Sequence, residues 1–146
     1  MVSELNLGDS GGSLLTSVVA KLIAKAPARA KCIFLNCEMR DTSDDIAISP
    51  DLFAVVKPLF GKAKRVVLEV DWETADLLMS LGRHILSGPI GRHVTIDLII
   101  NERGSCKAYR DDGSLRRLAG GDGMYRSKYL YYLEQAPWLA ALNKLG

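Results

Sequence analysis

The stretch 93–110, HVTIDLIINERGSCKAYR, decides the fold class of this chain. Its first half alternates between two sets of side chains: Val94, Ile96, Leu98 and Ile100 on one side, and His93, Thr95, Asp97 and Ile99 on the other. Every second residue of a strand faces the same way, so this pattern predicts a strand with one buried face. Residues 101–104 have turn chemistry, and 105–110 can return as an antiparallel partner.

A second pair of strands is expected earlier in the chain. Residues 31–38 (KCIFLNCE) are strand-like, with Ile33, Leu35 and Cys37 on one side and Cys32, Phe34 and Asn36 on the other. The polar run 39–45 (MRDTSDD) reads as a loop, and 46–49 (IAIS) as a short strand returning from it. The β-branched run 65–70 (RVVLEV) indicates a further strand or a piece of buried core.

Helices are expected between these strands. Apolar residues recur at helical spacing over 12–26 and again over 72–86. Ser49-Pro50-Asp51 has the chemistry of a helix start, so a further helix is predicted there, with an apolar stripe of Phe53, Val56 and Phe60. A last helix is expected over 124–135, before Pro137.

These elements predict one α+β domain over residues 1–146, with helices packed on a mostly antiparallel sheet. A chain of 146 residues is long enough to bury one hydrophobic core. No apolar run approaches the roughly 20 residues that a membrane-spanning helix needs, and no positively charged leader opens the chain. Three cysteines are too few for a disulfide scaffold and suit a reducing compartment. We therefore expect a cytoplasmic protein without a membrane partner.

The net charge of +2 conceals a charge polarity along the chain. Residues 38–51 contain five acidic residues and one basic residue. Residues 103–128 contain seven basic residues and three acidic ones. Such asymmetry bears on partners and association rates rather than on fold.

The motif Gly8-Asp9-Ser10-Gly11-Gly12 matches the residues around the nucleophile of trypsin-like proteases. That mechanism needs a histidine base and a buried aspartate, and in that family both precede the serine. Only seven residues precede Gly8 here, so we expect no catalytic role. Asp9, Ser10 or Ser13 is instead expected to cap the following helix.

No other motif indicates a catalytic, metal or cofactor site. His84 and His93 lack a cluster of cysteines or carboxylates at ligand spacing, and Cys32 and Cys37 should point to opposite faces of a strand. The run 121–123 lacks the third glycine of a dinucleotide motif and the ending of a P-loop. We therefore expect a protein that is not an enzyme and that binds no metal or cofactor.

The order of elements resembles the YezG-like immunity proteins, small cytoplasmic domains that bind and neutralise a cognate bacterial toxin domain. The resemblance lies in the strand–acidic turn–strand pattern of 31–49 and in the pattern of 94–133. That second part runs from a hydrophobic strand through a glycine turn, an aromatic-containing strand and Asp-Asp to an Arg/Lys-Tyr-Leu helix. It implies a protein-binding function.

Acidic loops suit a partner with a basic surface, such as a nuclease toxin. We predict that the partner-facing charges are Glu38, Asp41, Asp44 and Asp45. Two other functions stay open: a secretion chaperone or adaptor for an effector, and a nucleic-acid-binding accessory protein that uses the basic region 103–128. Nucleic acid is the less expected partner.

Overall fold

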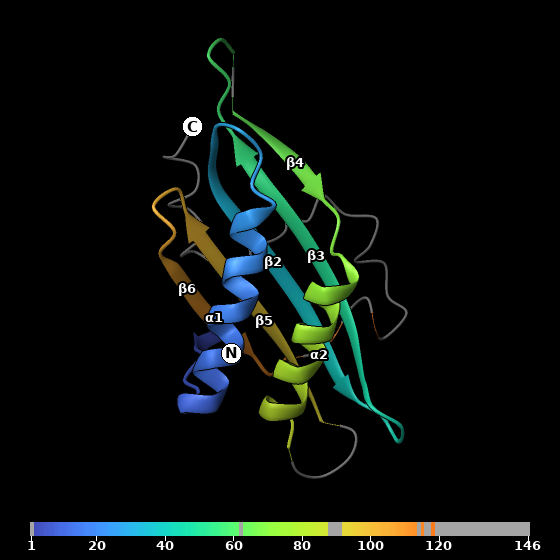
Figure 1. Cartoon of the computed structure of the whole chain (residues 1–146). Helices are drawn as coiled ribbons and strands as arrows, with labels where there is room; N and C mark the ends of the chain where they lie inside the picture. The colour runs from blue at the N-terminus through green and yellow to red at the C-terminus, as the bar shows by residue number, and fades with distance from the viewer. Residues whose placement is uncertain (1, 62, 88–91, 114, 116–117, 119–146) are drawn as a thin grey trace.

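The computed structural model describes residues 2–61, 63–87, 92–113, 115 and 118. These residues form a six-stranded antiparallel sheet in the order β1-β6-β5-β2-β3-β4, with helices α1 and α2 side by side on one face (Figure 1). The predicted α+β fold is confirmed. The elements are β1 Val2–Glu4, α1 Asp9–Ala24, β2 Ala30–Asp41, β3 Ile46–Val56, β4 Lys64–Leu68, α2 Trp72–Ile85, β5 His93–Asn101 and β6 Cys106–Asp111.

The centre of the sheet is the long hairpin of β2 and β3. Eight consecutive residues of β2, from Cys32 to Met39, are buried, so both faces of this strand are covered. One face packs in the main core with α1 and α2: Ile33, Leu35, Cys37 and Met39. Its other face carries Cys32, Phe34, Asn36 and Glu38. The predicted division of this strand into two sides is therefore confirmed.

The helix predicted from Ser49 is wrong, because this segment continues β3 as far as Val56. The pairing with β2 runs without interruption from Asp41↔Ile46 to Cys32↔Val55. Pro50 fits because the pairing of β3 with β4 begins only at Leu52, so in the described residues no ladder on that side needs its missing N–H. The residues from Leu52 to Val56 are all buried, as in a central strand.

The two predicted helices are confirmed as α1 and α2. Asp71 caps α2 by accepting a hydrogen bond from the Thr74 N–H at 2.8 Å. The cap predicted for α1 is wrong: the helix begins at Asp9, Gly8 is its N-cap residue, and none of the described side chains makes a cap hydrogen bond there.

Glycines allow the helices to pack closely. A Cβ atom added to Gly11 of α1 would lie 2.7 Å from Nε2 of His84 in α2. A Cβ atom on Gly82 of α2 would lie 2.9 Å from Cγ2 of Ile46 in β3. These two glycines therefore set how near α2 comes to α1 and to the sheet.

Strand β1 was not foreseen in the sequence. It is three residues long and pairs with β6 at one edge of the sheet. The helix predicted over 124–135 lies outside the described residues. Within the part of the chain that the structure describes, neither helix has the length and apolarity to cross a membrane.

Candidate interaction site

The predicted loop 39–45 is shorter in the structure: β2 continues as far as Asp41, and the tight turn between β2 and β3 comprises residues 42–45. Thr42 makes two hydrogen bonds across the turn: its N–H donates to the Asp45 carbonyl at 2.8 Å, and its hydroxyl donates to the same oxygen at 2.6 Å. The Asp45 N–H donates back to the Thr42 hydroxyl at 3.1 Å. The turn is therefore ordered by its own hydrogen bonds.

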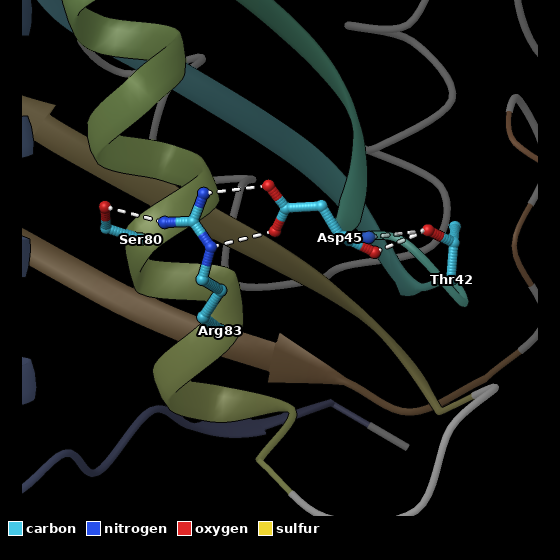
Figure 2. A network of polar contacts seen from close by, with 4 residues as sticks. All are labelled: Thr42, Asp45, Ser80 and Arg83. Atoms are coloured by element: carbon cyan, nitrogen blue, oxygen red, sulfur yellow. Dashed lines mark hydrogen bonds and ion pairs between the residues drawn. The ribbon is translucent and has the colours of Figure 1, made fainter.

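Helix α2 fixes this turn to the rest of the molecule. Figure 2 shows Arg83 of α2 reaching the Asp45 carboxylate, with Nε 2.8 Å from Oδ1 and Nη2 3.0 Å from Oδ2. The third guanidinium nitrogen of Arg83 donates to the Ser80 hydroxyl at 3.2 Å. A two-pronged contact of this kind fixes direction as well as distance. Asp45 therefore anchors the turn to α2.

The ion pair also decides what charge Asp45 presents. The hydrogen bonds from Arg83, with a further one from the backbone of Ile46, lower the pKa of the Asp45 carboxyl to about 2. The same pair raises the pKa of Arg83. An aspartate is ionised near neutral pH in any case, and here its charge is matched by that of Arg83. The remaining acidic groups of the turn are Asp44, which is exposed, and Asp41, which is half-buried.

Glu38 is not on this surface. Its residue is 2 % exposed, and its Oε1 accepts a hydrogen bond from the Leu118 N–H at 3.2 Å. The neighbouring Arg40 donates to the Leu118 carbonyl at 3.3 Å. The prediction that Glu38 faces a partner is therefore corrected: the alternation of β2 directs it onto the sheet face opposite the helices, where it is buried.

A buried polar pair lies next to Glu38 and was missed in the sequence. The Asn36 side-chain amide donates to Oδ1 of Asp97 at 2.6 Å, and these residues are 2 % and 6 % exposed. They face each other in the register of β2 and β5. The signal was present, since each is a polar residue inside an apolar run. The alternation of 93–100 predicts a polar side for Asp97, whereas the structure buries it on the second face of the sheet.

A pocket of about 170 Å³ lies between the end of α1, the start of β2 and the turn after β5. Cys32 and Arg29 are among its lining residues. Burial raises the pKa of the Cys32 thiol to about 11, so little thiolate exists near neutral pH. The same effect acts on Cys106. Neither thiol is poised as a nucleophile.

The remaining sequence candidates belong to different elements: Ser10 to α1, His84 to α2 and His93 to β5. Ser10 is exposed in the first turn of α1, next to the glycine that packs on His84. Among the described residues, no group of three or more His, Cys, Asp and Glu side chains is arranged to hold a metal ion. Cys32 and Cys37 face opposite sides of β2, as predicted.

The basic region 103–128 is described only in part. Arg103 is exposed in the turn after β5, and Arg110 is paired with Asp112 at 2.8 Å. Its other basic residues beyond 113 lie outside the described residues.

No protein-family model, curated protein or solved structure matches this chain. The resemblance to YezG-like immunity proteins thus stays a prediction. The candidate interaction site is therefore defined by the structure alone, as an acidic turn held in place by Arg83.

Proposed function

We propose that this protein is a non-enzymatic binding domain that neutralises a cognate bacterial toxin domain. The observation that carries the proposal is the fixed acidic turn, in which Arg83 and Thr42 hold Asp45 while Asp44 stands exposed beside it. A turn already ordered before binding loses less conformational entropy in the complex than a mobile one. A turn with a fixed conformation before binding favours recognition of a partner that is itself folded.

The contact charges in this proposal are Asp41 and Asp44. Asp45 acts through the conformation of the turn, and Glu38 is left out because it is buried. A toxin that binds nucleic acid carries basic groups for phosphate, and those groups are complementary to an acidic turn. Charge complementarity of this kind chiefly accelerates association. A cytoplasmic location belongs to the same proposal, because a nuclease toxin acts there.

The experiment is capture of the partner followed by a growth assay. The tagged full chain is used to retain proteins from a lysate of the source organism. The captured protein's C-terminal domain is then expressed with and without this chain. Arrest of growth by that domain alone, relieved by co-expression, is the expected result. A partner without toxicity would overturn the proposal, and a secreted effector would favour the adaptor function instead.

The role of the turn is tested on the same complex. Asp44→Lys should slow association and weaken its dependence on salt. Glu69→Lys, an equal change at an exposed residue beyond the end of β4, is the matched control and should leave association unchanged. If both variants change association equally, the β2–β3 turn is not part of the interface.

A further inference from the structure

The turn between β3 and β4 carries two large apolar side chains in water. Phe60 is 90 % exposed and Leu59 is 70 % exposed, and they are adjacent at the apex of the turn. Figure 1 shows this turn projecting beyond the rest of the sheet, at the end opposite the β2–β3 turn. Neither the core nor the acidic site uses these residues. An exposed apolar pair of this size on a projecting turn indicates a contact surface.

The chain segment that forms this apex carries charges of one sign only. The sequence 52–68 contains four basic residues and no acidic residue. Among the described ones, Lys64 and Arg65 are exposed at the start of β4, and the Lys57 ammonium donates to the Gly61 carbonyl at 2.7 Å within the turn. Arg29 lies beside the base of the turn, where its carbonyl accepts from the Lys57 N–H at 3.1 Å.

We infer that this basic apolar tip, Leu59 and Phe60 with Lys57, Lys64, Arg65 and Arg29, docks on the surface of an anionic phospholipid bilayer. Leu59 and Phe60 occupy the middle of the projecting turn, and Lys57, Lys64 and Arg65 flank them along the chain. A bilayer has the complementary order, since its anionic headgroups lie outside its acyl chains. Apolar insertion and attraction to anionic lipid then act together.

Other partners fit this order less well. A nucleic acid presents its phosphates outermost, so cations rather than Leu59 and Phe60 would have to stand foremost. A protein partner in a specific complex buries about 800 Å² on each side, much more than two side chains at an apex can supply. The inference is independent of toxin binding, and it differs from the expectation of no membrane partner drawn from the sequence.

The test is sedimentation of the full chain with vesicles. One set contains phosphatidylcholine alone, and the other contains phosphatidylcholine with phosphatidylglycerol. Binding is expected only to the second set and should weaken as salt is raised. Phe60→Ser should weaken it about tenfold or more. Lys64→Glu should weaken it by about fivefold for the lost charge and further for the added opposite charge.

Two matched variants control for surface chemistry alone. Trp72→Ser removes another exposed aromatic residue, 78 % exposed at the start of α2, away from the tip. Arg92→Glu reverses an exposed charge beside β5 at the other end of the sheet. Both should bind vesicles like the unaltered chain. Circular dichroism checks that all four variants are folded.

Two outcomes would overturn the inference. One is failure of the unaltered chain to bind phosphatidylglycerol vesicles. The other is equal weakening by Phe60→Ser and Trp72→Ser, because binding would then not run through the tip. If the unaltered chain binds no vesicles and Phe60→Ser no longer retains the captured toxin, the tip belongs to a protein interface instead.

Discussion

The close approach of the two helices at Gly11 makes a stability prediction that can be worked from distances. A Cβ atom at this position would meet Nε2 of His84 at 2.7 Å, Cδ2 of His84 at 2.8 Å and Cβ of Leu7 at 2.8 Å. All three are shorter than a van der Waals contact. The next residue, Gly12, lies in the same helical turn, and a Cβ atom there meets nothing within 4 Å.

Gly11→Ala should therefore lower the free energy of unfolding relative to Gly12→Ala. Each alanine gains up to about 1 kcal/mol of helix propensity over glycine. Only Gly11→Ala carries an overpacking cost, which is about 1–3 kcal/mol. The difference between the two variants is therefore about 1–3 kcal/mol, with each kcal/mol corresponding to about 2–4 °C in melting temperature for a chain of this size.

Urea unfolding of both variants measures this difference, and a double-mutant cycle assigns it. His84→Ala removes two of the three close contacts, so it should recover part of the stability lost in Gly11→Ala. Recovery should be incomplete because the Leu7 contact remains. Equal stability of Gly11→Ala and Gly12→Ala would refute the close packing of α1 on α2.

Three further outcomes are expected. The pKa of Asp45, about 2 in the unaltered chain, should rise towards its ordinary value in Arg83→Gln while that of Asp71 stays near 2, and an NMR titration of both variants would measure this. Stability from the Asp45 carboxylate is full above about pH 4 and is lost as pH falls through about 2, so Arg83→Gln should flatten the acid limb of the stability curve. The Cys32 thiol should react with iodoacetamide slowly at pH 8 and rapidly in denaturant, as followed by mass spectrometry. Arg29 has a φ of 66°, a left-handed conformation that glycine adopts without strain. Arg29→Gly should therefore raise the free energy of unfolding of the protein by about 0.5–1 kcal/mol, as measured by urea unfolding.

The strands that could be predicted are those whose local pattern agrees with their environment. β5 alternates cleanly, and the structure buries Val94, Ile96, Leu98 and Ile100 on the helix side. The helix expected from Ser49 failed for the opposite reason. Ser49-Pro50-Asp51 is a favourable local signal for a helix start, but pairing of this segment with the whole of β2 outweighs it. Pro50 does not disrupt the strand, because in the described residues no ladder lies on the side of β3 away from β2 at this position.

The candidate site was predictable in part. Asp41, Asp44 and Asp45 lie at the turn that the sequence indicated. The burial of Glu38 is indicated only weakly in the sequence: Cys32 and Phe34 lie on the same side of β2, but Glu38 also stands next to the acidic loop and so resembles part of it. The pairing of Arg83 with Asp45 was equally hidden, since 38 positions separate them and only the packing of α2 on β3 brings them together.

The central place of β2 has a consequence for how the molecule opens. β2 pairs with β3 along one side and with β5 along the other, from Cys32 to Arg40. Opening it must break two ladders at once, whereas β1 is bound through three residue pairs among the described residues. Amide hydrogen exchange should therefore proceed from the edges of the sheet inward. The amides of β2 should be the last to exchange, whereas the acidic turn and the basic apolar tip lie beyond the two ends of β3 and should exchange earlier.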